Sequence, residues 1–169
     1  MKRHSKRGRM ADNQRPDSKW SETVADALTA SNFEIHLLEL DPREDSFVLR
    51  VDKLVESVPL SCQADLIPSI FRFFEKYPLE DCGAPGTLVH LTEHFYPSYK
   101  DILLESLARA PSLNALLMVN RMLNSDLPEQ EREEYFSALR GVAERVDIHP
   151  SLANQASRFI SYQSQKSGR

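Results

Sequence analysis

The feature of this sequence that most constrains its fold is the run SLNALLMVNRMLNS, from Ser112 to Ser125. Pro111 ends any preceding helix, Ser112 can cap a new one, and Pro128 marks the next boundary. The main apolar stripe at helical spacing consists of Leu113, Leu116, Leu117, Val119 and Leu123, with Met118 and Met122 opposite. A helix that is apolar nearly all round is buried on most of its surface, so the rest of the chain must pack around this one.

Two asparagines interrupt this apolar helix. Asn120 and Asn124 are four residues apart and therefore share one side of it. A buried amide without a hydrogen-bond partner costs about 1–3 kcal/mol on mutational data. We therefore expect both side chains to bond to neighbouring backbone or to face a binding partner.

Seven further segments show apolar residues at helical spacing, and most of their boundaries lie at prolines. The predicted helices are Trp20–Leu40, Asp45–Val58, Ser61–Tyr77, Gly86–Tyr96, Ser98–Ala110, Pro128–Val146 and Ser151–Gln163. In the third of them, Pro68 marks either a kink or the start of the regular helix. The segment PLEDCGAP, at Pro78–Pro85, predicts a mobile surface loop.

These segments predict an all-α protein, either a helical bundle or a HEAT-like stack of antiparallel helix pairs. The pairs follow a loose period of about 35–40 residues, without a strict repeat in the letters. We expect one helical domain at residues 20–163, between a disordered basic tail at 1–19 and a frayed tail at 164–169. The residues expected to face the core include Val48, Phe136 and Val146.

Charge is distributed unevenly along the chain. Residues 1–19 carry seven Lys or Arg and two Asp, a net charge of +5, and the remainder carries 14 basic and 23 acidic residues, a net charge of −9. An acidic body argues against nucleic acid as the ligand and for a basic partner. No apolar run is long enough for a membrane span of about 18 residues, so no membrane partner is expected. Without a signal-peptide pattern, we expect a cytoplasmic protein whose cysteines, Cys62 and Cys82, are reduced.

The segment HLTEH at residues 90–94 matches the H-x-x-E-H pattern of inverted zincins. His90 and His94 could hold zinc, and Glu93 could act as the general base. The pattern fixes only three positions, and adding Cys82 as a ligand still leaves a zinc site without a fourth. We therefore expect these residues to form the polar face of an amphipathic helix, and we expect no metal, no cofactor and no catalysis.

From Gly86 to about residue 162 the chain resembles bacterial immunity proteins of polymorphic and contact-dependent toxin systems. The resemblance is carried by Leu88-Val89-His90, by Tyr99, by LLESL at 103–107, by Pro111-Ser112, by NRMLNS at 120–125, and by His149-Pro150-Ser151 with Phe159. It implies a helical, HEAT-like domain. It also implies a small cytoplasmic protein that binds and blocks one cognate toxin and catalyses nothing.

The first functional hypothesis is therefore an immunity protein that binds a basic toxin domain as a monomer or weak dimer. The alternatives are a helical-repeat adaptor for an unrelated partner and a zinc hydrolase that uses the HLTEH segment. The expected contact residues combine acidic and polar side chains with one aromatic and one arginine anchor. They are Glu80, Asp81, His90, Glu93, His94, Tyr96 and Arg121.

Overall fold

The computed structural model of this chain describes residues 29–167. Its elements are α1 (Ala30–Leu38), α2 (Phe47–Glu56), the 3-10 helix η1 (Leu60–Leu66), α3 (Ile67–Lys76), α4 (Thr87–His94), α5 (Lys100–Arg109), α6 (Leu113–Met122), α7 (Glu129–Ala143) and α8 (Pro150–Ser167). No strand occurs in this range, which confirms the all-α prediction. None of these helices is both long enough and apolar enough to cross a membrane. The predicted basic tail and the segment 20–28 of the first predicted helix lie outside the described residues.

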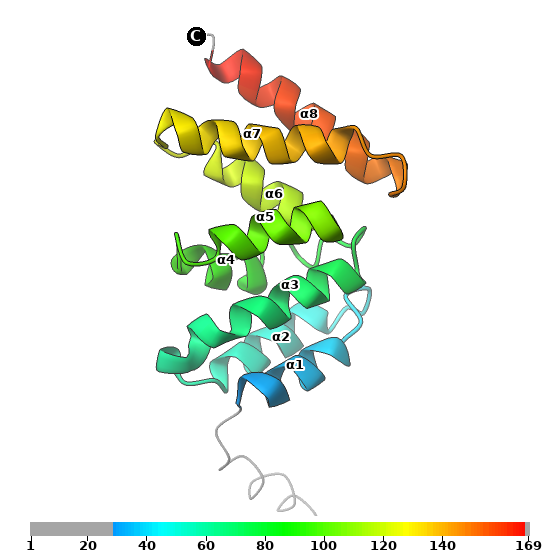
Figure 1. Cartoon of the computed structure of the whole chain (residues 1–169). Coiled ribbons are helices and arrows are strands. Elements are labelled where there is room, and N and C mark those ends of the chain that lie inside the picture. The colour runs from blue at the N-terminus through cyan, green and yellow to red at the C-terminus, as the bar shows by residue number, and fades with distance from the viewer. Residues whose placement is uncertain (1–28, 168–169) are drawn as a thin grey trace, which may run out of the picture.

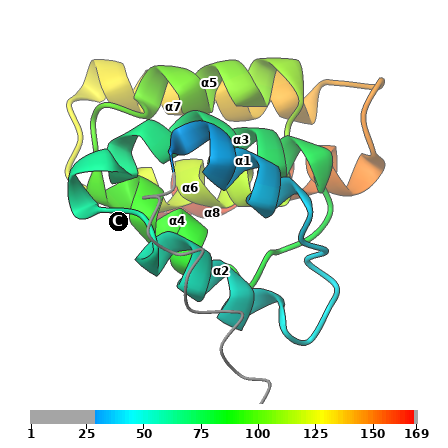
Figure 2. The ribbon, with the colours of Figure 1, turned by 90° about the horizontal axis from the view of Figure 1, so that it is seen from below.

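The helices form two layers that stack in chain order from α1 to α8 (Figure 1). In the odd layer, α3 packs on α1, α5 on α3 and α7 on α5; in the even layer, α4 packs on α2, α6 on α4 and α8 on α6. Figure 2, which looks along the stack, shows the two layers side by side. Across the layers, α1 contacts α2, α3 contacts α4, α5 contacts α6 and α7 contacts α8, so the fold is a stack of helix pairs.

Helix α6 lies at the centre of this arrangement and contacts α3, α4, α5, α7 and α8. Ser112 is the N-cap residue of α6, as predicted. Its Oγ accepts a hydrogen bond from the Ala115 amide at 3.2 Å. The residues that it buries are Asn114, Ala115, Leu116, Met118, Val119 and Met122, followed by Leu123 at its end. The prediction was wrong for Leu117, which is only half-buried. Its neighbours along the helix, Leu113 and Asn120, are also half-buried, so this line of the helix lies at the border of the core.

Asn120 of α6 and Asn124, which follows its C-terminal end, bind helix α8. Gln163 Nε2 donates to Asn120 Oδ1 at 2.8 Å and to Asn124 Oδ1 at 3.1 Å. Lys166 Nζ donates to the same Asn124 oxygen at 2.9 Å. The expected partners were backbone or a second protein; the structure instead uses side chains of a neighbouring helix. These contacts hold the end of α8, which continues to Ser167 and is therefore longer than the predicted helix Ser151–Gln163.

Polar bridges join successive helices of the odd layer. A Ser-x-x-Arg sequence occurs on both α3 and α5, and in each case the serine and the arginine bind a glutamate of the preceding odd helix. Arg72 Nη2 lies 2.6 Å from Glu34 Oε2, and Arg109 Nη2 lies 2.7 Å from Glu75 Oε1. The hydrogen bond from Arg72 lowers the pKa of Glu34. The partners are 31–38 residues apart in the chain, close to the predicted period.

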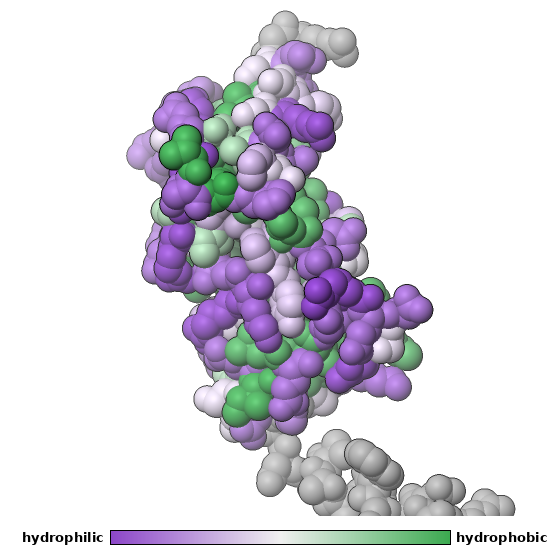
Figure 3. All heavy atoms as spheres, turned by 90° about the vertical axis from the view of Figure 1, so that its right-hand side faces the viewer, coloured by the Kyte–Doolittle hydropathy of each residue, from purple (hydrophilic) through white to green (hydrophobic). Residues whose placement is uncertain are grey.

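Several predicted boundaries and core residues differ from the structure. The third predicted helix is split into η1 and α3. Pro68 lies in the first turn of α3, which agrees with the alternative that the regular helix starts near this proline. Val48 is 47% exposed and Val146 is 98% exposed, so both were wrongly expected in the core. Helix α7 ends at Ala143, which places Val146 in the α7–α8 connection; Figure 3 shows hydrophobic atoms at the surface there. Tyr135 is fully buried, whereas its neighbour Phe136 is half-buried.

The two adjacent leucines of α6 provide a matched test of this packing. Leu116 is fully buried and Leu117 is half-buried. We expect Leu116→Ala to lower the free energy of unfolding by about 2–5 kcal/mol, because it leaves a cavity in the core. Leu117→Ala should cost less than half as much. Urea denaturation of both variants measures the difference, and equal losses would contradict the placement of α6.

A second prediction concerns Gly141, in the last turn of α7. A Cβ atom built there would meet no atom within 4 Å. Glycine in a helix is less favourable than alanine by roughly 0.5–1 kcal/mol. Gly141→Ala should therefore raise the free energy of unfolding by about this amount, measured by thermal or urea denaturation. A lower stability of the variant would show that the position is not open.

Candidate functional site

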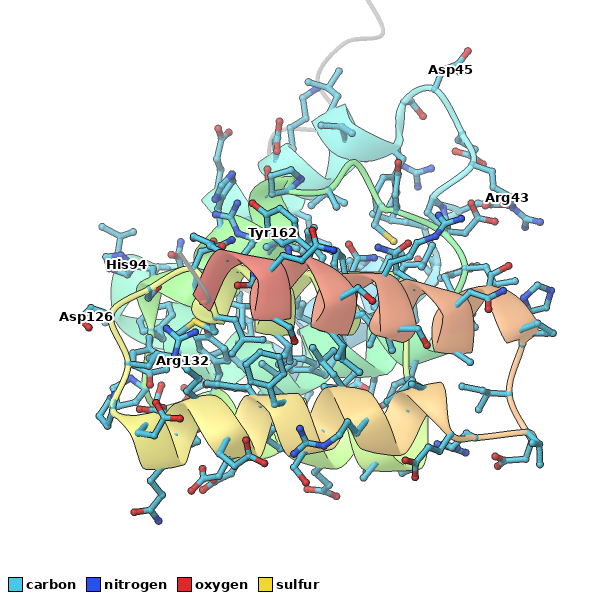
Figure 4. The ribbon with its side chains drawn as sticks, turned by 90° about the horizontal axis from the view of Figure 1, so that it is seen from above. Arg43, Asp45, His94, Asp126, Arg132 and Tyr162 are labelled. Carbon is cyan, nitrogen blue, oxygen red and sulfur yellow. The ribbon has the colours of Figure 1, made fainter. Side chains whose placement is uncertain are left out.

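Three of the predicted contact residues, Glu93, Tyr96 and Arg121, line one pocket of about 460 Å³. We call it the edge pocket; its other lining residues are Tyr99, Met122, Asn124 and Ser125. It lies where the α4–α5 connection meets the end of α6. Figure 4 labels three side chains, His94, Asp126 and Arg132, at this edge of the stack, and Arg43 and Asp45 at the opposite edge.

Arg121 and Glu93 form a bidentate ion pair that joins α6 to α4. Arg121 Nε donates to Glu93 Oε1, and Arg121 Nη2 donates to Glu93 Oε2 at 2.8 Å. This pairing raises the pKa of Arg121. The Arg121 side chain is still 37% exposed, compared with 19% for Glu93. The pair therefore holds a charged guanidinium in one orientation while leaving part of it accessible from solvent.

Tyr96 connects the edge pocket to α7. Its hydroxyl donates to Glu131 Oε1, and Lys100 Nζ lies 3.3 Å from the same oxygen and 2.6 Å from Glu134 Oε2. The tyrosine hydroxyl is the main cause that lowers the pKa of Glu131, and Lys100 adds to it. These contacts fix the half-buried Tyr96 ring at the border of the pocket.

Two buried tyrosines lie beneath this surface. Tyr99 and Tyr135 are both fully buried. The Tyr99 hydroxyl lies 3.1 Å from Met122 Sδ, and Lys100 Nζ lies 5.7 Å from the centre of the Tyr135 ring. Burial raises the pKa of both phenols, so they stay neutral at physiological pH. They support the pocket as packed aromatic groups.

The structure places Glu80 and Asp81 at the other end of α6. Asn114 Nδ2 donates to the Glu80 carbonyl at 2.9 Å, and the Leu113 amide donates to the Pro78 carbonyl at 2.9 Å. Glu80 is half-buried and Asp81 is exposed. Asn114 and Arg121 are two helical turns apart, about 10 Å along the axis. The expected contact residues therefore form two separate groups, and hydrogen bonds anchor the predicted loop to α6.

The HLTEH segment forms the end of α4, with His90 and His94 exposed. Glu93 binds Arg121, and His90 Nδ1 lies 3.6 Å from Glu93 Oε2. Burial raises the pKa of Cys82 to about 12, so its thiol is protonated at neutral pH and is a poor metal ligand. Across the part of the chain that the structure describes, no three His, Cys, Asp or Glu side chains are grouped so as to hold a metal ion. The geometry gives the zinc-hydrolase alternative no support.

The seven expected contact residues did not include Glu131 and Glu134 of α7, which complete this site, or their partner Lys100. The sequence nevertheless contains a signal for these contacts. Tyr96 and Glu131 are 35 residues apart, which is one helix-pair period. The same separation joins Thr87 to Asp52 in the previous repeat. An offset of one period therefore identifies residues that meet between neighbouring repeats.

Comparison of this chain with protein-family models, with curated proteins and with solved structures found no match.

The contact between Tyr96 and Glu131 predicts a pH-dependent effect. A lowered carboxyl pKa stabilises the folded state above the ordinary value of 4.5, and this stabilisation is lost as the pH falls through the lowered value. Tyr96→Phe should therefore destabilise the protein by about 1 kcal/mol at pH 7 and by progressively less below pH 4.5. The pKa of Glu131, followed by NMR titration, should rise towards 4.5 in the variant. An unchanged titration of Glu131 would show that the hydroxyl does not bind it.

Proposed function

We propose that this chain is a non-catalytic immunity protein that acts in the cytoplasm, binding a cognate bacterial toxin domain and neutralising it. The observation that carries the proposal is the edge pocket. There Arg121 and Tyr96 are each held by a carboxylate and remain partly accessible. Arginine and tyrosine are among the residues that most often dominate the energy of protein interfaces. The resemblance of residues 86–162 to immunity proteins agrees with this reading.

The fixed orientation of these side chains favours tight binding. Ordering a flexible side chain at an interface costs about 0.5–1.5 kcal/mol. Glu93 already orients Arg121, and Glu131 already orients Tyr96, so less of this cost remains to be met on association. The edge pocket is therefore preorganised for a protein partner.

The charge of the folded part indicates the kind of partner. Residues 29–167 contain 21 acidic and 13 basic residues, a net charge of −8. Such a surface attracts a basic protein and raises its rate of association. A basic toxin domain, such as a nuclease, fits this charge.

The stack of helix pairs supports one other function. Stacked helix pairs present extended surfaces that suit adaptor proteins. In that case the edge pocket would bind a partner unrelated to toxins, and the same variants would disrupt its binding.

A protection assay tests the proposal. Cells would express the C-terminal domain of the toxin encoded beside this protein's gene, together with wild type or variants. We expect Tyr96→Ala combined with Arg121→Ala to abolish protection, because it removes both anchors. The matched control is Arg43→Ala combined with Tyr77→Ala, an arginine and a half-buried tyrosine at the opposite edge, beside the Glu80–Asp81 loop.

Circular dichroism and thermal denaturation would first confirm that both double variants are folded. If the edge-pocket variant still protects, the assigned surface is wrong. If only the control loses protection, the interface lies at the Glu80–Asp81 edge instead. If wild type neither protects nor binds the toxin domain, the immunity function is wrong and the adaptor function takes its place.

A further inference from the structure

An apolar groove of about 590 Å³ lies on the odd layer, between α5 and α7. Its floor includes the buried side chains of Leu107 and Val142. Small residues widen it from both sides, and the charged side chains Glu134 and Arg145 border it. The remaining lining residues are Leu104, Ala108, Ser137, Ala138 and Gly141. We call it the α5–α7 groove.

We call the interface between two successive helices of the odd layer a seam. The α5–α7 seam is built differently from the other two. In the α1–α3 and α3–α5 seams, an arginine–glutamate pair crosses the surface. The α5–α7 seam is joined only at its ends within residues 29–167. Lys100 binds Glu131 and Glu134 at one end, and Arg145 Nη1 donates to the Ala108 carbonyl at 2.9 Å at the other. Between these contacts, no polar bridge formed by the described residues covers the apolar floor.

Gly141 keeps the groove open. A Cβ atom at this position would meet nothing within 4 Å, so no close packing inside the protein requires a glycine there. Glycine is nevertheless unfavourable in a helix. One structural use of glycine is to let a ligand approach the backbone closely. The open space beside Gly141 is where such an approach is possible.

The rim of the groove is acidic. Asp101 lies on the same face of α5 as Leu104 and Ala108, and Glu144, the C-cap residue of α7, follows Gly141 by three residues. Both carboxylates are exposed and have no ion-pair partner within the described part of the chain. The basic side chains around the groove are already paired: Lys100 with Glu134, Arg109 with Glu105, Arg140 with Glu133 and Arg145 with Asp147. The unpaired charge at the rim is therefore negative.

We propose that the α5–α7 groove binds a basic amphipathic helix of the toxin domain, with apolar residues on its floor and Lys or Arg over Asp101 and Glu144. This inference rests on the proposed function and specifies that the groove binds a helix of the partner. An apolar floor inside a charged rim is the arrangement in which interface energy concentrates.

A helix fits this groove better than a strand. The described residues contain no strand, so an extended peptide would find no sheet edge with which to pair its backbone. Helices pack by placing the side-chain ridges of one into the groove of the next. On α7 the lining residues of the groove extend from Glu134 to Val142, about 12 Å, or slightly more than two turns of a bound helix.

The groove continues the surface assigned to the edge pocket. Glu134 borders the groove and binds Lys100; Lys100 also binds Glu131, which in turn binds Tyr96 of the edge pocket. One partner domain can therefore contact both. In such an interface the edge pocket supplies oriented polar contacts and the groove buries apolar surface.

Binding of the purified toxin domain tests this inference by calorimetry or surface plasmon resonance. Gly141→Leu fills the groove at a position with open space, so the variant should fold normally. We expect it to weaken binding about tenfold or more, mainly through faster dissociation. The matched control, Ser157→Leu, places the same side chain at an exposed position of α8 and should change the affinity less than about twofold. Asp101→Lys combined with Glu144→Lys should mainly slow association and weaken its salt dependence.

A crosslinking experiment locates the occupant independently of stability. With p-benzoylphenylalanine in place of Ser137, which lines the groove, irradiation should link this chain to a helix of the toxin domain. If wild type binds and Gly141→Leu binds equally well, the groove inference is wrong while the immunity function stands. A crosslink to a second copy of this chain would overturn it in favour of self-association. If wild type does not bind the toxin domain at all, the proposed function itself fails.

Discussion

The fold depends on the burial of α6 between helices of both layers. Its Leu116, Met118 and Val119 are fully buried, and removing apolar surface from water is the main favourable contribution to folding. Polar contacts then determine how the neighbours are oriented on it. Gln163 fastens α8 to the two asparagines, Arg121 fastens α4 through Glu93, and Asn114 holds the preceding loop. The same helix therefore organises the core and supplies one anchor of the candidate site.

Local signals in the sequence predict the number and order of the helices, because periodicity and prolines act within each segment. These signals do not predict correctly whether a residue is buried when that depends on where a helix ends. Val146 continues the apolar pattern of α7, yet the helix has ended before it. Leu117 fits the apolar stripe of α6 but lies where no helix covers it fully. Tyr135 was missed as a core residue because it is buried beside Lys100 at the start of α5, and no pattern within α7 indicates this neighbour.

The candidate site was predictable in part. Tyr96, Glu93 and Arg121 were expected to bind a partner, and the structure brings them together; Glu80 and Asp81 lie at the other end of α6. Contacts between repeats depend on how one helix pair sits on the next, which local patterns do not contain. A separation of about one helix-pair period along the sequence does indicate which residues meet, as Tyr96 and Glu131 show. The α5–α7 groove was not predictable, because it results from small residues on two helices that meet only in the stack.

Native-state hydrogen exchange tests the central role of α6 most directly. Amides that exchange only through global unfolding belong to the most stable part of a fold, whereas end elements open locally. If α6 is the centre, its amides from Leu116 to Met122 should exchange most slowly, with an opening free energy equal to that of global unfolding. Those of α1 and α2, at one end of the stack, should exchange faster. Exchange in α6 as fast as in α1 would contradict the account.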